Sequence, residues 1–183
     1  MQSDPGKVGS RVPSVRVLVV EDHEPFRRLV CSMLETRPEL QVIGRVSDGL
    51  EAVQKAEKLQ PDLILLDIGL PTLSGIEAAR RIRKLSPESK IIFLTQESSA
   101  DLVREALSLG AKGYVVKAKA GSELLIAMEA VRQGTEFVSK GLLGHTFTNV
   151  EETQVADCLG HEEDLPSLAS RPGHFARGHV VKF

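Results

Sequence analysis

Five short apolar runs alternate strictly with five amphipathic segments over most of this 183-residue chain. The apolar runs lie at residues 15–20, 40–46, 63–66, 90–94 and 113–116, and the amphipathic segments at 25–36, 49–59, 74–84, 100–109 and 122–133. The third segment shows the helical period clearly, because Ile76, Ala79, Ile82 and Leu85 share one face. Strands that alternate with helices in this way predict a parallel sheet covered by helices on both faces.

The apolar run 63–66 is followed directly by a carboxylate, Asp67. Four consecutive apolar residues predict a strand that is buried on both faces, as strands of parallel sheets are. Open α/β sheets bind their ligands outside the carboxyl ends of the strands, so Asp67 is expected at the ligand-binding edge. Taken alone, Asp67 could also be a turn residue before Pro71.

The first apolar run ends in the same way, with Glu21 and Asp22. Because the carboxyl ends of parallel strands meet at one edge of the sheet, these two side chains and Asp67 are expected to converge. Three carboxylates at close range repel one another unless a cation neutralises them. The sequence therefore predicts a Mg²⁺ site held by Asp22 and Asp67, helped by Glu21 through water and by the backbone carbonyl of Gly69.

Two more strand ends bring polar groups to this edge. The fourth run ends in Thr95 and the fifth in Lys117. Asp67 can attack phosphorus as carboxylates do in aspartyl-phosphate chemistry. Lys117 can pair with Asp67 or with a phosphoryl oxygen, and the Thr95 hydroxyl can donate to a phosphoryl oxygen. Each residue has an ordinary structural role as the alternative, but together they supply the positioning and charge compensation that phosphoryl transfer requires.

The composition excludes several other classes of protein. The net charge is −2, so no bulk attraction to nucleic acid is expected. The two cysteines are far apart in the sequence, and Cys31 falls in a helical pattern that predicts a core position. No signal peptide precedes the first run, and no apolar stretch approaches the length of a membrane span. We therefore expect a cytoplasmic location.

The chain divides into three parts by pattern. Residues 1–13 predict a flexible tail, 14–139 a folded domain, and 140–183 a linker or irregular tail. Four of the five histidines lie in this last part, but their spacing matches no compact metal site. Residues 179–183 resume a strand-like apolar pattern, which leaves two alternatives open: a frayed tail, or the start of an output domain.

Residues 14–139 resemble the receiver domain of response regulators, and are most similar to the NarL/FixJ branch. The resemblance is carried by the stretches VLVVEDH, SDGLEAV, PDLILLDIGLP, SGIEAARRIR, IIFLT and GAKGYVVK. It implies a flavodoxin-like (βα)5 fold, which is a doubly wound parallel sheet with strand order 2-1-3-4-5. It also implies that Asp67 accepts a phosphoryl group from a sensor histidine kinase, and that Thr95 and Tyr114 form a switch pair.

The resemblance further implies a two-component signalling module that controls an output domain or partner and can form a homodimer. Such a domain catalyses only its own phosphorylation and dephosphorylation, so it is not an enzyme with a diffusing substrate.

This chain departs from the family pattern at two places. Gln96 stands where the residue after the switch threonine is usually small, and its side chain could shield a phosphoryl group from water. No helix-turn-helix pattern follows residue 141, so nucleic-acid binding is not expected of this chain. Two other classes fit less well: a haloacid-dehalogenase-type phosphohydrolase needs a second Asp at position 69, and a flavin-binding module needs a hydroxyl-rich loop where the chain has Glu21 and Asp22.

Overall fold

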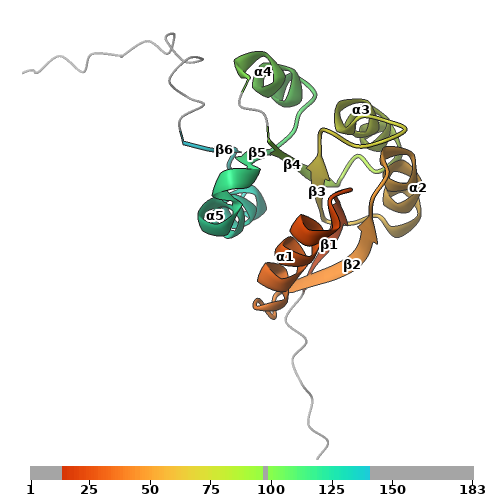
Figure 1. Ribbon diagram of the computed structural model, residues 1–183. Coiled ribbons are helices and arrows are strands. Elements are labelled where there is room, and N and C mark those ends of the chain that lie inside the picture. The colour runs from red at the N-terminus through yellow and green to blue at the C-terminus, as the bar shows by residue number, and fades with distance from the viewer. Residues whose placement is uncertain (1–13, 97–98, 141–183) are drawn as a thin grey trace, which may run out of the picture. The chain divides into compact units, whose positions relative to one another are not determined.

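The computed structural model describes residues 14–96 and 99–140. The strands are β1 Val15–Val20, β2 Leu40–Val46, β3 Leu63–Asp67, β4 Lys90–Thr95, β5 Gly113–Val116 and β6 Phe137–Val138. The helices are α1 Glu24–Glu35, α2 Gly49–Leu59, α3 Gly75–Leu85, α4 Ala100–Ser108 and α5 Ala120–Arg132, with a short 3₁₀ helix η1 at Lys117–Lys119 (Figure 1). The tail expected at 1–13 and nearly all of the segment expected at 140–183 lie outside the described residues, so these boundaries stay predictions.

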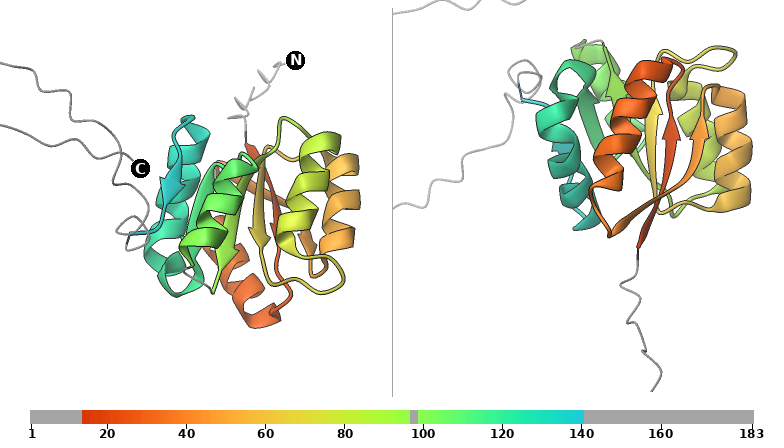
Figure 2. Two further views of the ribbon diagram at one scale, coloured as in Figure 1. Left: turned by 90° about the horizontal axis from the view of Figure 1, so that it is seen from above. Right: turned by 60° about the horizontal axis from the view of Figure 1, so that its bottom comes forward.

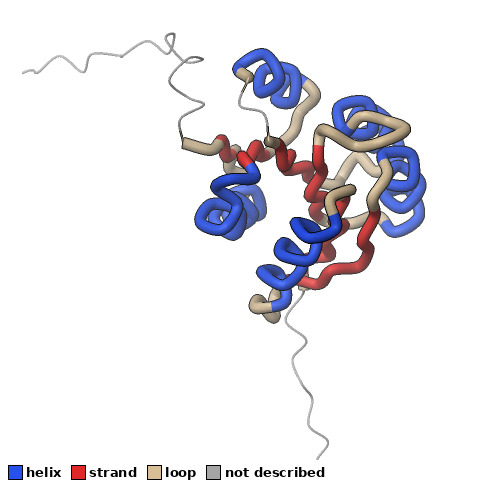
Figure 3. The backbone as a smooth tube through the Cα atoms, viewed as in Figure 1, coloured by secondary structure: helices blue, strands red, loops and turns tan. Residues whose placement is uncertain are grey.

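The strands form one sheet in the order β2-β1-β3-β4-β5-β6, and every pair of neighbours is parallel. This confirms the flavodoxin-like doubly wound fold and the order of the first five strands. Figure 3 shows the strands in the middle, with helices on both sides of them. The sixth strand, β6, was not predicted from the sequence. It pairs only Phe137 and Val138 with β5, and two residues are too few to show a strand period.

The central strands are buried on both faces. Residues Leu63–Leu66 of β3 are 0–3% exposed, as their unbroken apolar run predicts. Alternate residues along each strand enter two separate cores, because successive side chains of a strand point to opposite faces. Leu18 and Val20 of β1 pack in the core that contains residues of α2, α3 and α4, whereas Val17 and Val19 pack in the core that contains residues of α1 and α5. Figure 2 shows α1 and α5 together on one face of the sheet.

Most predicted helix boundaries are within one residue of the structure, but the start of α5 was wrong. The sequence pattern placed it at Ser122, and α5 begins at Ala120, directly after η1. Ser122 instead donates a hydrogen bond from its hydroxyl back to the carbonyl of Lys119. Cys31 is buried in the α1 and α5 core, as predicted. None of the helices in the described part of the chain has both the length and the apolar character that crossing a bilayer requires.

Candidate functional site

The carboxyl ends of four neighbouring strands gather the polar residues that the sequence singled out. Glu21 follows β1, Asp67 ends β3, Thr95 ends β4 and Lys117 follows β5. Register explains the convergence, because Asp67 lies beside Leu94 of β4, and Thr95 beside Val116 of β5. The side chains are therefore brought to one edge by the parallel topology alone.

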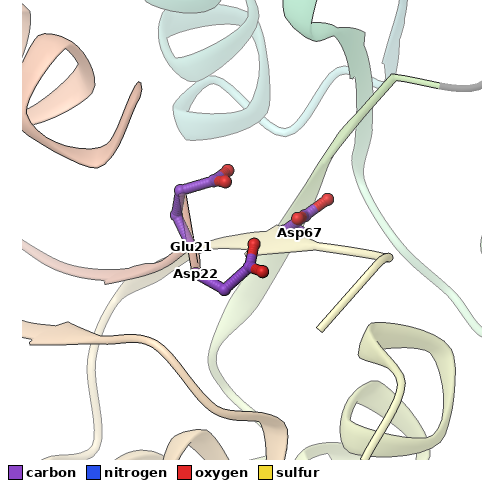
Figure 4. Close-up of side chains that lie close together, drawn as sticks. All are labelled: Glu21, Asp22 and Asp67. Carbon is purple, nitrogen blue, oxygen red and sulfur yellow. The ribbon is translucent and has the colours of Figure 1, made fainter. Parts of the chain in front are cut away.

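The three predicted carboxylates do converge. One carboxylate oxygen each from Glu21, Asp22 and Asp67 lies within 4.8 Å of the others (Figure 4). Glu21 is fully buried and Asp67 is 4% exposed, while Asp22 lies at the surface. The cluster thus has a buried inner side and one residue that faces solvent.

Lys117 reaches into this cluster and contacts two of its members. Its Nζ lies 2.8 Å from Oδ2 of Asp67 and donates a hydrogen bond of 2.8 Å to Oε1 of Glu21. The lysine side chain is only 9% exposed. The pairing with Asp67 agrees with the sequence analysis, whereas the pairing with Glu21 was not predicted.

Burial and charge act in opposite directions on these groups. Burial raises the pKa of Glu21 above its ordinary value of 4.5; the hydrogen bond from Lys117 opposes this effect, and the nearby charge of Asp67 adds to it. For Lys117, burial alone would lower the pKa, but the hydrogen bonds to Asp67 and Glu21 outweigh burial and raise it. Lys117 is therefore a cation at neutral pH that compensates part of the acidic charge.

The residues present fit a hard divalent cation. Three carboxylates face a single ammonium group, so the cluster keeps an excess of negative charge. Oε2 of Glu21 is buried and accepts no hydrogen bond from the described residues, although it forms an ion pair with Nζ of Lys117 at 2.8 Å. Because the one ammonium group beside this oxygen is shared with Asp67, the oxygen keeps lone-pair capacity for a cation, directly or through water. This set of oxygen donors suits Mg²⁺.

The other predicted site residues lie at or near the same edge. Thr95 is 2% exposed at the end of β4, next to the strand that carries Asp67. Tyr114 lies further back in β5 and is fully buried, in the core beneath α2, α3 and α4. Gly69 is exposed in the loop after β3, and a Cβ atom built there would lie 3.9 Å from Oδ2 of Asp67. Position 69 therefore borders the carboxylate without covering it.

The loop after Asp67 is held by close backbone packing. The amide of Gly75 donates to the carbonyl of Ile68 at 2.9 Å, and α3 begins at this glycine. A Cβ atom on Gly75 would lie 1.9 Å from the backbone oxygen of Asp67, so no other residue fits without moving the acceptor strand. Gly75 thus lets the start of α3 pack directly against the backbone of Asp67.

Two residues of α1 belong to the site and were missed by the sequence analysis. The ring of Phe26 lies under Lys117, with 5.2 Å between Nζ and the ring centroid. Nη1 of Arg27 donates to the carbonyl oxygens of Glu21 at 2.5 Å and Asp22 at 3.4 Å. Both lie just after the acidic pair in the sequence, but an amphipathic helix pattern gives them no distinguishing signal.

Residues 17–129 match the family described as the response regulator receiver domain. Among curated proteins, the transcriptional regulatory protein LiaR of Bacillus subtilis is 33% identical over 148 residues, which cover 81% of this chain and 70% of LiaR. A protein of Pseudomonas aeruginosa is 40% identical over 119 residues, which cover 65% of this chain. The chain spans only 57% of that protein's length.

A solved structure with the same architecture is the crystal structure of a LuxR-family two-component response regulator from Aurantimonas. It has a TM-score of 0.65 and 32% sequence identity, and the match covers 72% of this chain and 94% of that chain.

Proposed function

The chain belongs to the response regulator receiver domain family of two-component systems, in its LuxR/NarL branch, and we propose that Asp67 is its phosphoacceptor. The observation that carries this assignment is the contact of Asp67 with Lys117 beside two further carboxylates at the carboxyl edge of the sheet. In this proposal the phosphoryl group comes from a sensor histidine kinase, and the domain controls an output domain or partner.

The chemistry follows from the positions of the side chains. An oxygen of the Asp67 carboxylate forms a bond to phosphorus, and the bond from phosphorus to the donor nitrogen breaks with its electron pair leaving on the donor. Glu21, Asp22, Asp67 and the carbonyl of Gly69 would hold Mg²⁺, which supplies charge compensation between the carboxylate and the phosphoryl group. Lys117 supplies a further positive charge, and its hydrogen bond to Glu21 orients it.

Thr95 and Tyr114 are proposed to change conformation when Asp67 is phosphorylated. The Thr95 hydroxyl would donate to a phosphoryl oxygen, and such a contact exists only in the phosphorylated state, so it biases the domain toward one conformation. Tyr114 is fully buried here, so its inward position is already compatible with the packing of the core.

The proposed activity is limited to the domain's own phosphorylation and hydrolysis, because the acceptor is part of the chain. Partner contacts of the family extend to homodimers, and here Leu29 of α1 and Ile126 of α5 are 51% and 60% exposed on the face that these two helices cover. This face is the one that we propose for contacts with a second copy.

A small phosphodonor tests the assignment directly. Incubation of the full chain with acetyl phosphate and Mg²⁺ should add one phosphoryl group, measured by intact mass, and the product should be labile as acyl phosphates are. Asp67→Asn should abolish it, because an amide is a poor nucleophile and a weaker metal ligand. Asp101→Asn is the matched control, since its carboxylate is 85% exposed on α4 and lies in an ion pair with Arg104. Undiminished, acid-stable phosphorylation of Asp67→Asn would disprove the assignment.

A further inference from the structure

Ser139 is a buried polar residue outside the part of the chain that matches the receiver family. The match ends at residue 129, whereas Ser139 directly follows β6 and is 0% exposed. A serine that has lost all contact with water needs protein partners for its hydroxyl and its backbone. The partners that it has connect this segment to the proposed site.

The hydrogen bonds of Ser139 lead to β5 and to the start of α5. Its Oγ accepts a hydrogen bond of 3.0 Å from the amide of Val116, and the same hydroxyl donates to a carboxylate oxygen of Glu123. Its amide donates to the carbonyl of Tyr114 at 2.9 Å. The serine hydroxyl thus accepts one hydrogen bond from β5 and donates another to α5. Because Ser139 is fully buried, water cannot take the place of either bond.

Two of these partners lie in β5, the strand that leads directly into Lys117. Val116 directly precedes Lys117, and Tyr114 belongs to the proposed switch pair. A second contact follows Lys117 in the sequence, because Nζ of Lys119 donates to the carbonyl of Lys140. Residues 139 and 140 are therefore bonded to the backbone just before Lys117 and to a side chain just after it.

We propose that Ser139 is a positioning residue that couples the phosphorylation site to residues 137–140. By fixing the amide of Val116, it holds the end of β5 that presents Lys117 to Asp67 and Glu21. When Lys117 changes partners, from a carboxylate pair to a phosphoryl oxygen, the shift of its backbone acts on Val116 and hence on Ser139. Coupling of this kind is reciprocal, so the state of residues 137–140 also biases the acceptor site. The coupling rests on the proposed function, because it requires that Asp67 be phosphorylated.

The experiment uses the full chain as wild type, Ser139→Ala, and Ser122→Ala as the matched control. Ser122→Ala also removes a serine hydroxyl near the start of α5. In the wild type, however, that hydroxyl donates only to the carbonyl of Lys119. In Ser139→Ala the amide of Val116 loses its acceptor, so its hydrogen exchange should accelerate by about tenfold relative to both other proteins. The Glu123→Gln variant keeps an acceptor for the serine hydroxyl and should retain most of the protection.

The decisive readout is the response to phosphorylation. Acetyl phosphate and Mg²⁺ should shift the amide signals of residues 137–139 in the wild type and in Ser122→Ala. In Ser139→Ala these shifts should fall by at least about half, while intact mass still shows a phosphoryl group on the protein. Phosphorylated wild type with unchanged signals at 137–139, or equal shifts in all variants, would overturn the coupling and leave the phosphoacceptor intact. Wild type that takes up no phosphoryl group would overturn both.

Discussion

Removal of the Lys117 charge should destabilise the domain strongly in the absence of Mg²⁺. Lys117 is the cation that the described residues bring within ion-pair distance of both buried carboxylates, Glu21 and Asp67. Removing one partner of a buried pair costs about 3–5 kcal/mol, because the remaining charge stays desolvated. The site lies at the edge of the sheet and includes the exposed Asp22, so we expect about 3 kcal/mol for Lys117→Met.

The assay is urea unfolding of the full chain near neutral pH without metal. A loss of about 3 kcal/mol corresponds to a decrease of about 1–2 M in the urea midpoint for a domain of this size. Lys112→Met is the matched control, since its Nζ pairs with Glu136 at 3.1 Å while both side chains are about half exposed. An exposed pair of this kind contributes only about 0.2–1 kcal/mol.

The pH dependence gives a second test of the same reasoning. The pKa of Glu21 is raised in the folded protein above its ordinary value of 4.5. At a pH between 4.5 and the folded-state pKa, the folded protein therefore binds a proton that the unfolded protein has lost. The contribution of this protonation to the stability of the folded state is therefore fully present below pH 4.5, and it is lost as the pH rises through the folded-state pKa of Glu21. Without Lys117 this pKa rises further, so the loss in Lys117→Met should be largest near neutral pH and should shrink in acid. Added Mg²⁺ should restore part of the stability. Equal losses in the two lysine variants, or a loss that does not shrink in acid, would refute the argument.

Three further predictions concern the surroundings of the site. Under the hypothesis that the exposed side chain of Gln96 shields the phosphoryl group from water, Gln96→Ala should speed spontaneous dephosphorylation, followed by intact mass over time; an unchanged or slower rate would count against shielding. Gly75→Ala should lower the free energy of unfolding by at least about 2 kcal/mol, because its Cβ would lie 1.9 Å from the carbonyl oxygen of Asp67, whereas Gly121→Ala, with nothing within 4 Å, should be neutral or stabilising in α5. Phosphorylation should shift amide signals between Thr95 and Lys117, and phosphorylated protein without a change there would contradict the switch mechanism.

Most residues of the site could be predicted from the sequence. The prediction needs only the positions of the apolar runs and the rule that parallel strands end at one edge of the sheet. Apolar runs mark the strands, and the residue after each run marks the strand's carboxyl end. Since parallel strands place these ends on one edge, the order of residues along the chain is enough to assign Glu21, Asp67, Thr95 and Lys117 to one site.

The tertiary structure decided the contacts that no local pattern encodes. The sequence did not predict that Lys117 pairs with Glu21 as well as with Asp67, because the separation of 96 residues between Glu21 and Lys117 carries no periodic signal. Phe26 and Arg27 look like ordinary residues of α1 until packing brings them against the site.

Residues 137–139, at the end of the domain, show most clearly the difference between what the sequence predicts and what only the tertiary structure reveals. β6 has two residues and Ser139 is a single polar residue, so neither has enough length to form a pattern in the sequence. Their role comes from register: β6 lies along β5, and this places the Ser139 hydroxyl where the amide of Val116 needs an acceptor. The sequence by itself determined the first five strands and the chemistry that they carry to the edge, and only the three-dimensional pairing of β5 with β6 decided which later residues are hydrogen-bonded beside that edge.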